Sequence, residues 1–586
     1  MAAQLPRPIY GSDLAVWMMR QLEVPYIALN TGSSFRGLQD SVVNYANNVG
    51  PEIIQCTHEE ISVAIAHAYA KATGKPMVAA AHNVVGLQHA SMAIYNAYTD
   101  RAPVIVVGGT GPMDATTRRP GIDWLHTALV QGELVRNYVK WDDQPSTIGS
   151  IPDSFLRGYQ TATMHPQGPV YICYDSTIQE GMVSEDLVLP VVGNYPPPSP
   201  MGPDPDALHI LAGWLVEAQA PLVVADHVGK DPQAVEALIE LAELLALPVA
   251  DRGGRFNFPS NHPLDVTGTE LDLFKDRDLV LALESRDPYG LFHVRDLHHW
   301  DTEPFIPPSC KVASISLWDL RGGGWAQDYQ RIAPLDLNIL ADTSVALPML
   351  VDECRKLLGS GNRDKYDKRY EAIRTSHDET RARWQQRAQE NRGVSPVSTG
   401  RLAGEVWQQI QGEDWVLGNG NAAGWARRLW DFDRHYRHIG ASGGGGLGYG
   451  YGAAIGAALA HRDTDRLIVN IQSDGDLMYT PGALWTASHH RLPILTVMFN
   501  NRDLYNSDEH AYNVASMRDR RVDSRGIGVY MDDPPVDFAK LAEAQGVFAI
   551  GPIDDPEKLA PALQEAMRMV KEEKLPALVD VVCQLR

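Results

Sequence analysis

The feature that most constrains the fold is a regular alternation of short apolar runs with amphipathic helical patterns along almost the whole chain. Helical patterns such as Ala207–Ala218 and Pro232–Leu245 lie between these runs. This rhythm predicts an α/β fold with mainly parallel sheets flanked by helices, and such sheets bind ligands at the carboxyl ends of their strands. The clearest apolar runs are Val104–Val107, Val170–Cys173, Leu222–Ala225, Leu279–Ala282, Leu467–Ile471 and Ile494–Phe499.

The chain is long enough for several domains, and two breaks divide it into three parts. Its 586 residues exceed what one hydrophobic core usually serves. Prolines at positions 196–198, 200 and 203 mark an extended linker. A charged, helix-prone stretch from Asp364 to Asn391 ends at Gly393–Pro396. We therefore expect three α/β domains, at residues 1–190, 205–358 and 395–586.

The charge balance excludes some partners. There are 51 Lys and Arg residues against 73 Asp and Glu residues, which gives a formal net charge of −22. So acidic a chain is poorly suited to bind nucleic acid or an anionic membrane, and it would hold phosphates through backbone amides or a metal ion. No apolar run approaches the length of a membrane span. The five cysteines are scattered without metal-ligand spacing, which favours free thiols and a cytoplasmic protein: Cys56, Cys173, Cys310, Cys354 and Cys583.

The most informative segment contains Ser473–Asp476 and the Asn500-Asn501 pair. Each follows an apolar strand, and we expect a helix that begins at Thr480-Pro481 and ends near His490 to join the two strands. A carboxylate and an amide oxygen at the carboxyl ends of neighbouring strands suit magnesium, which prefers oxygen ligands. The alternative interpretation is an ordinary βαβ turn with a solvated Asp474.

This segment resembles the diphosphate-binding motif of thiamine-diphosphate enzymes, which reads Gly-Asp-Gly, a spacer, and Asn-Asn. The resemblance implies that Asp474, the Asn501 side chain and the main-chain carbonyl of Asp503 bind Mg²⁺, and that Gly475 and Asp476 lie beside the diphosphate. The sequence departs from the pattern twice, because Ser473 replaces a glycine and Asp476 stands where a small residue is usual.

A second segment, Thr57–Lys75, resembles the catalytic-glutamate helix of the same family, with Glu59 in the active position. A carboxyl group there promotes the imino form of the cofactor's aminopyrimidine, which can then deprotonate the thiazolium C2 and give the ylid. The alternative is that Glu59 and Glu60 are acids favoured by the dipole at a helix start.

Two glycine-containing segments also match the family. Gly443–Gly456 resembles the stretch that holds the aminopyrimidine, which implies that the Gly445 carbonyl accepts a hydrogen bond and that Leu447 supports the bent cofactor. Leu417–Ala422 resembles a loop that contacts the diphosphate, through Asn421 and Ala422. Without the resemblance, a flexible loop ahead of a tightly packed helix explains the glycines equally well.

The substrate pocket shows features of two groups within the family. Ala81–Gly86 aligns with the pocket loop of the benzoylformate decarboxylases, which implies that His82 relays protons, and His126 is a second candidate. The His58-Glu59 pair, the Phe258–Leu264 segment and the length of the segment after Asn501 resemble the acetolactate synthases, in which that last segment forms a lid. FAD, which the central domain of that group often binds, is unlikely here, because the Met-His-Gly-type clamp is missing.

The resemblance implies a pyrimidine-type N-terminal domain, a central Rossmann-like domain and a diphosphate-type C-terminal domain. The leading hypothesis is a thiamine-diphosphate- and Mg²⁺-dependent 2-oxo acid decarboxylase and carboligase, similar to acetolactate synthase, that acts through a C2 ylid and an enamine. The alternatives are a lyase that releases an aldehyde, as the benzoylformate decarboxylases do, an acyloin or diketone lyase or hydrolase, and a cofactor-binding subunit with little activity. A homodimer or a dimer of dimers is expected.

Overall fold

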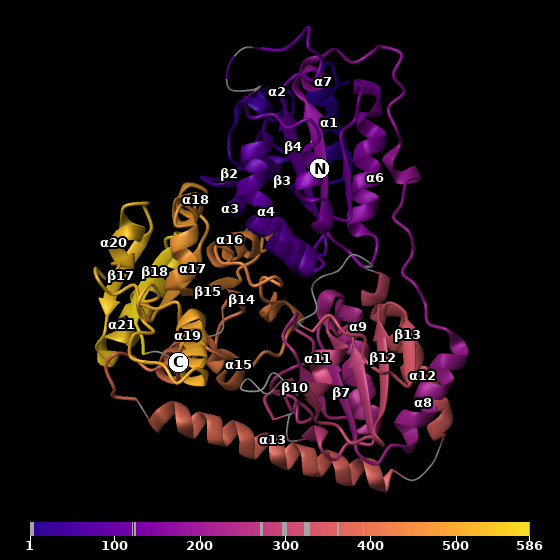
Figure 1. The fold of residues 1–586 in the computed structure, drawn as a ribbon, viewed down its shortest axis with the longest axis vertical. Coiled ribbons are helices and arrows are strands. Elements are labelled where there is room, and N and C mark those ends of the chain that lie inside the picture. The colour runs from indigo at the N-terminus through magenta and orange to yellow at the C-terminus, as the bar shows by residue number, and fades with distance from the viewer. Residues whose placement is uncertain are drawn as a thin grey trace.

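The computed structural model describes residues 5–119, 121, 125–269, 273–295, 302–320, 329–359, 363–390, 392–420 and 422–584. Figure 1 shows three α/β bodies, one for each of three parallel sheets, which follow one another along the chain. None of the helices in these ranges is both long enough and apolar enough to span a bilayer. The expected α/β fold with three mainly parallel sheets is confirmed.

The N-terminal sheet has six parallel strands in the order β2-β1-β3-β4-β6-β5. Helices α3 (Glu59–Thr73) and α4 (Asn83–Thr99) pack on one face, and α1 (Gly11–Gln21) and α6 (Ile151–Thr163) pack on the other. The carboxyl ends of β2 and β3 lead directly to the starts of α3 and α4. The strands are β1 Tyr26–Leu29, β2 Glu52–Gln55, β3 Met77–Ala81, β4 Val104–Thr110, β5 Trp141–Asp143 and β6 Val170–Asp175.

The central sheet has five parallel strands in the order β13-β12-β9-β7-β8. Helices α8 (Pro205–Glu217), α9 (Pro232–Leu245) and α12 (Thr343–Leu358) pack against one of its faces. A short antiparallel ladder, β10 with β11, lies beside it. The strands are β7 Pro221–Ala225, β8 Val249–Asp251, β9 Leu279–Leu283, β10 His293–Arg295, β11 Thr302–Pro304, β12 Lys311–Ser316 and β13 Leu337–Leu340.

The C-terminal sheet has five parallel strands in the order β14-β15-β16-β18-β17. One face carries α14 (Thr399–Ile410) and α21 (Leu559–Lys571), and the other carries α16 (Gly450–Ala460), α18 (Ala483–His489) and α20 (Phe538–Glu543). The strands are β14 Trp415–Asn419, β15 Leu467–Ser473, β16 Ile494–Asn500, β17 Phe548–Ile553 and β18 Ala577–Val582.

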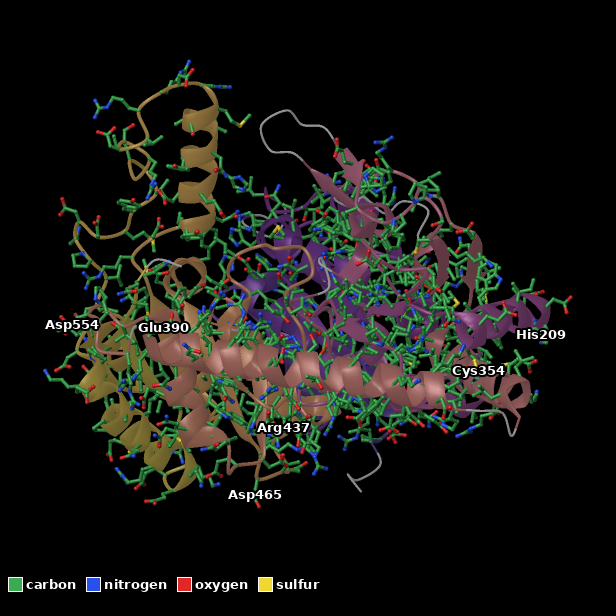
Figure 2. All side chains as sticks on the ribbon, turned by 90° about the horizontal axis from the view of Figure 1, so that it is seen from below. His209, Cys354, Glu390, Arg437, Asp465 and Asp554 are labelled. Carbon is green, nitrogen blue, oxygen red and sulfur yellow. The ribbon has the colours of Figure 1, made fainter. Side chains whose placement is uncertain are left out.

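A single long helix, α13 (Asp364–Glu390), connects the central body to the C-terminal body. It runs along the outside of both bodies (Figure 1) and lies across the near side of the molecule in Figure 2, with Glu390 at its C-terminal end. Four of its side chains are buried, and most of the others face solvent. The charged, helix-prone stretch that begins at Asp364 is therefore confirmed as a helix.

Helices α3 and α16 join the N-terminal and C-terminal bodies. Glycines at four-residue intervals let the two helices approach closely: a Cβ on Gly452 would lie 2.7 Å from Cβ of Ala64, and a Cβ on Gly456 would lie 2.8 Å from Cβ of Ala68. Because the contacts advance along both helices in the same direction, the helices run parallel. The N-terminal ends of α3 and α16 therefore lie at the same end of the helix pair.

Most of the predicted elements agree with the structure. All six predicted strands are present, and the helix predicted at Pro232–Leu245 has those bounds. The segment after β15 is a correction, because a helix, α17 (Asp474–Tyr479), already begins at Asp474, ahead of α18. Thr480 is not the N-cap of the following helix, because α18 begins at Ala483 with Gly482 as its N-cap, and the Thr480 hydroxyl instead donates to the Gly448 carbonyl at 2.9 Å.

Candidate active site

Glu59 is the first residue of α3 and is buried, with 3% of its surface exposed. His58 caps the helix by accepting a hydrogen bond at Nδ1 from the Glu60 amide at 3.2 Å. The Oε2 atom of Glu59 lies 3.3 Å from Nδ1 of His89 on α4. The carboxylate is thus held between the starts of two helices rather than exposed to solvent as a first-turn helix acid would be.

His82 lies beside Glu59, between β3 and α4. Its Nδ1 is 2.8 Å from Oγ of Ser34, and its Nε2 is 3.4 Å from Nδ1 of His126. A Cβ on Gly86 would lie 2.7 Å from Oε1 of Glu59 and 3.0 Å from Cβ of His82. The structure therefore brings the two predicted catalytic residues together around Gly86, with His126 next to them.

Asp474 is the first residue of α17 and lies at the carboxyl end of β15, with 1% of its surface exposed. Its Oδ1 accepts a hydrogen bond from the Gly475 amide at 2.9 Å, and its Oδ2 accepts one from the Arg502 amide at 2.6 Å. Burial raises the pKa of the Asp474 carboxyl to about 6. Because β15 and β16 are paired in parallel, the Asp474 carboxylate lies against the turn that contains Asn501.

Asp503 lies in the same turn and is buried. Its amide donates to Oδ1 of Asn501 at 3.2 Å, and neither carboxylate oxygen has a hydrogen-bond partner in the described part of the chain. Burial, with a contribution from Asp508, raises the pKa of Asp503 to about 6. A donor set made only of oxygens, with a buried and unpartnered carboxylate, fits a hard cation such as Mg²⁺.

Asp476 points at the glycine-rich segment. Its Oδ1 accepts from the Gly448 amide at 2.8 Å, and its Oδ2 accepts from the Gly450 amide at 2.9 Å and from Nε2 of Gln472 at 2.7 Å. These bonds satisfy amide groups at the start of α16, where the helix dipole also favours a negative charge. The carboxylate that departs from the family pattern therefore fixes the glycine-rich segment to α17.

The other predicted cofactor contacts lie on the glycine-rich segment and on the loop that follows β14. Gly445 has φ +71° with open space beside it, and Leu447 is 36% exposed. Ala422 follows β14 in a turn with φ +49°. Gly420 approaches β15 so closely that a Cβ there would lie 2.0 Å from the Ile471 carbonyl oxygen. Asn421 lies outside the described residues.

Glu60 connects the two halves of the site, and the sequence reasoning did not identify it as a functional candidate. A Cβ on Gly448 would lie 2.9 Å from its Oε1, and burial together with the nearby Asp476 carboxylate raises the pKa of Glu60 to about 7. Ser34 was also missed. Its position shortly after strand β1 was the available signal, because such positions lie at the ligand-binding edge of a parallel sheet.

Two models of one protein family match the two bodies that carry these residues. The N-terminal TPP binding domain of the thiamine pyrophosphate enzymes matches residues 9–134, and the C-terminal TPP binding domain matches residues 418–581. The first range contains Glu59 and His82, and the second contains Asp474 and Asn501. The chain belongs to the thiamine pyrophosphate enzyme family.

Relatives with assigned activities are similar over nearly the whole chain. Benzoylformate decarboxylase of Pseudomonas aeruginosa is 24% identical over 546 residues, which cover 90% of this chain and 91% of that protein. The acetolactate synthase large subunit of Haemophilus influenzae is 23% identical over 580 residues, which cover 96% of this chain and 92% of that protein. This thiamine-diphosphate-dependent enzyme is thus related to both groups, and the identities do not separate them.

Solved structures show the same fold. The 4-hydroxybenzoylformate decarboxylase of Rhodococcus jostii has a TM-score of 0.76 at 18% identity, with 98% of this chain and 99% of that chain covered. Benzoylformate decarboxylase of Polynucleobacter necessarius has a TM-score of 0.75 at 19% identity, with the same coverage.

Proposed function

We propose that the protein decarboxylates a 2-oxo acid, with thiamine diphosphate held through Mg²⁺, and passes the remaining carbon unit to a proton or to a second carbonyl compound. The observation that carries this proposal is the placement of the buried Glu59 and the half-buried His82 around Gly86, with Glu59 at the N-terminus of a helix that packs along the glycine-rich segment. When bound, the cofactor supplies the carbon that attacks the substrate carbonyl and the electron sink that carbon dioxide release requires.

In this proposal Asp474, the Asn501 side chain and Asp503 hold the metal ion. The resemblance assigned the main-chain carbonyl of Asp503 as a ligand, and its unpartnered carboxylate adds a second oxygen donor at the same residue. The proposed cofactor contacts are Gly475 in the first turn of α17, Gly445, Leu447, Asn421 and Ala422. Asp476 contributes indirectly, because its carboxylate is already bonded to the amides that start α16.

Glu59 is the proposed proton donor and acceptor to the cofactor's ring nitrogen. A buried carboxyl group exchanges its proton with a bound partner rather than with bulk water, which suits this role. His89 at 3.3 Å holds the Glu59 carboxylate from the α4 side.

One observation favours release of an aldehyde over carboligation. His82 and His126 form a pair at 3.4 Å beside Glu59, and Ser34 occupies the Nδ1 side of His82. A histidine pair can carry a proton to the reacting carbon, which is the step that ends in an aldehyde. Carboligation to an acetolactate-type product, in which a second carbonyl replaces that proton, is the competing outcome.

A homodimer or dimer of dimers is part of the proposal. Several large apolar side chains on α4, on the glycine-rich segment and on α17 are exposed to solvent. The exposed fractions are 36% for Met92, 36% for Leu447, 43% for Met478 and 60% for Tyr479. Exposed apolar patches of this kind mark surfaces that a partner covers, and a second copy of the chain is the partner that the family resemblance implies.

The test is carbon dioxide release from a panel of 2-oxo acids that includes pyruvate and benzoylformate, with and without Mg²⁺ and thiamine diphosphate. We expect release that needs both additions and collapses in Glu59→Gln. Analysis of the products then separates an aldehyde from an acetolactate-type acid. An absence of release from every acid, with the cofactor demonstrably bound, would refute the decarboxylase proposal and redirect the search to acyloin or diketone cleavage.

A further inference from the structure

The carboxyl edge of the central sheet is a ligand-binding position by topology. The chain passes from β7 to β8 on one side and then to β9 on the other, so the strand order reverses next to β7. Open parallel sheets hold ligands in the crevice at such a switch point. Here the crevice is bordered by Asp226-His227 after β7, by Arg255 after β8 and by Glu284 after β9.

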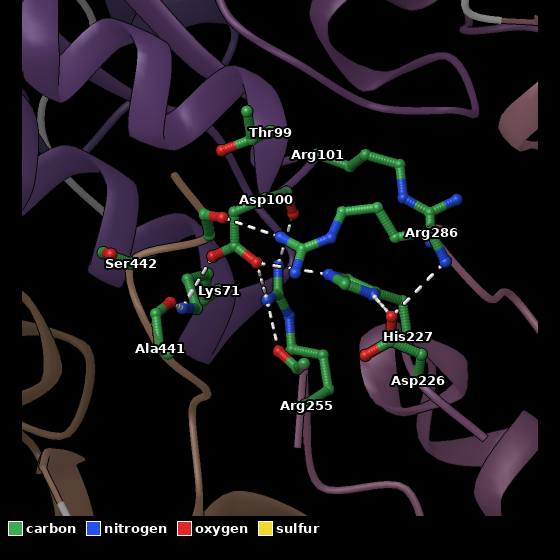
Figure 3. Close-up of polar contacts among 12 residues, drawn as sticks. Lys71, Thr99, Asp100, Arg101, Asp226, His227, Arg255, Arg286, Ala441 and Ser442 are labelled. Carbon is green, nitrogen blue, oxygen red and sulfur yellow. Dashed lines mark hydrogen bonds and ion pairs between the residues drawn. The ribbon is translucent and has the colours of Figure 1, made fainter. Parts of the chain in front are cut away.

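A turn of the N-terminal domain occupies this crevice. Asp100 and Arg101 follow α4, are 1% and 5% exposed, and project toward the central sheet (Figure 3). Asp100 pairs with Arg255, and its Oδ1 lies 3.4 Å from Nε2 of His227. The guanidinium of Arg101 lies 2.8 Å from Oε2 of Glu284 and 4.0 Å from the ring centre of Trp318.

The crevice is therefore filled by protein groups that pair with one another. Lys230 lies 2.8 Å from the second oxygen of Glu284 and 3.3 Å from Asp342, and Arg255 also donates to the Asp100 main-chain carbonyl at 2.9 Å. Arg101 and Glu284 both have positive φ values, +54° and +49°, a backbone conformation that such residues adopt only where surrounding contacts maintain it. A dinucleotide at this edge would have to displace these buried ion pairs, which is costly because each lost partner leaves a buried charge.

The same cluster holds the glycine-rich segment of the C-terminal domain. Lys71 contacts Asp100 at 2.7 Å and donates to the Ala441 carbonyl, and Arg286 donates to the Gly443 carbonyl at 2.7 Å. Gly443 has φ +81°, and a Cβ there would lie 2.5 Å from Cβ of Asp100. Groups from all three domains thus meet at Asp100 (Figure 3). The segment of the C-terminal domain that they hold, which contains Ala441 and Gly443, comes directly before Gly445 and Leu447 in the sequence.

We infer that the Asp100–Arg101 turn closes the ligand crevice of the central sheet to a flavin or other dinucleotide, and that the central domain instead positions the glycine-rich cofactor loop through Arg286. The central domain acts here as a clamp on residues 440–446. Arg286 is a positioning residue, since it contacts the loop and reaches the cofactor site only through it. The proposed cofactor contacts at Gly445 and Leu447 depend on this arrangement.

The first test measures whether FAD binds to the purified full-length protein. The protein is titrated into FAD, and binding is monitored by the fluorescence anisotropy of FAD. We expect FAD to remain free at protein concentrations in the micromolar range, with or without Mg²⁺ and thiamine diphosphate. One FAD bound per chain would overturn the inference that the crevice is closed.

The second test compares Arg286→Met with Arg277→Met, a matched change at the amino end of β9, far from the loop. Hydrogen exchange by mass spectrometry should show faster exchange at residues 440–446 in Arg286→Met only. The thiamine diphosphate Kd, measured by tryptophan fluorescence, should rise about tenfold, or about 1.4 kcal/mol, and Arg286→Lys should recover part of this loss. Exchange needs no cofactor, so it tests the clamp even if the proposed reaction is wrong. Unchanged exchange and Kd in a folded Arg286→Met variant would refute the positioning role.

Discussion

Replacement of Gly86 by alanine tests whether Glu59 and His82 share one site. The added Cβ would lie 2.7 Å from Oε1 of Glu59, whereas ordinary contacts begin at 3.4 Å, so the carboxylate must retreat by about 0.7 Å. A displacement of about 1 Å at a reacting group costs about 100-fold in rate. We therefore expect kcat at saturating cofactor to fall by about 10- to 100-fold. The fold should persist, because the closest atom is the movable end of a side chain, and Cβ of His82 and the carbonyl carbon of Ala81, at 3.0 and 3.1 Å, need to shift by only a few tenths of an ångström. Alanine is also favoured over glycine in a helix by about 1 kcal/mol.

The assay is carbon dioxide release with the best acid of the panel, alongside thermal unfolding. The control is Gly213→Ala on α8, where an added Cβ meets nothing within 4 Å. The control should keep full activity and a Tm at or slightly above that of the wild type. A Gly86→Ala variant with kcat within twofold of the wild type would refute the placement of Glu59 in the reaction.

Three further predictions follow from the same geometry. Asp474→Ala should abolish the Mg²⁺-dependent part of thiamine diphosphate binding in calorimetry, and binding that is unchanged with and without Mg²⁺ would contradict the assigned metal site. Burial alone would raise the pKa of Glu284, but Lys230 and Arg101 hold it at about 2. The lowered pKa of Glu284 therefore adds about 3 kcal/mol to the free energy of unfolding above pH 4.5. This contribution is lost as the pH falls toward 2. Glu284→Gln should remove this pH dependence from urea unfolding, and an unchanged profile would contradict the ion-pair assignment. Light scattering should show a dimer or tetramer, and a monomer at micromolar concentration would contradict the proposed covering of Leu447 and Tyr479.

Local pattern was sufficient to predict most of the architecture. Buried parallel strands give short apolar runs between helical patterns, and this signal was strong enough to locate β4, β6, β7, β9, β15 and β16 from the sequence. The start of α17 was missed, because a helix start at Asp474 needs only one turn and has no extended apolar period. The three-residue strands β5 and β8 are also too short for a period to be recognised.

Motif spacing indicated which residues are candidates to bind the cofactor, but not what surrounds them. The dipeptide Asn500-Asn501 offers two amides, and only the fold shows that Asn500 is occupied, since its Nδ2 donates to Asp580 at 2.9 Å. The direction of Asp476 depends on where Gly448 and Gly450 lie, which in turn depends on the packing of α16 along α3. Sequence reasoning has no access to that packing.

Contacts between residues far apart in the sequence, within a domain or between domains, could not be predicted for the same reason. Ser34 and His82 are 48 residues apart, and Asp100 and Arg255 are 155 residues apart. Neither pair belongs to a common local pattern, so only the assembled fold reveals them. The expectation that FAD is unlikely rests on a missing motif and stays a prediction. The inference that the central crevice is closed rests on different evidence, the ion pairs at Glu284, which the sequence does not show.

The most direct test of the account is the rate at which the C2 hydrogen of bound thiamine diphosphate exchanges with deuterium, measured by acid quench and proton NMR. This rate requires no knowledge of the substrate. The account predicts exchange faster than in the free cofactor by several orders of magnitude in the wild type and near the free rate in Glu59→Gln. Glu23→Gln, a change at an exposed glutamate of the same domain, is the control that should keep the acceleration. Exchange at the free rate in a wild-type protein that binds the cofactor would contradict the assignment of Glu59 and the enzymatic role built on it.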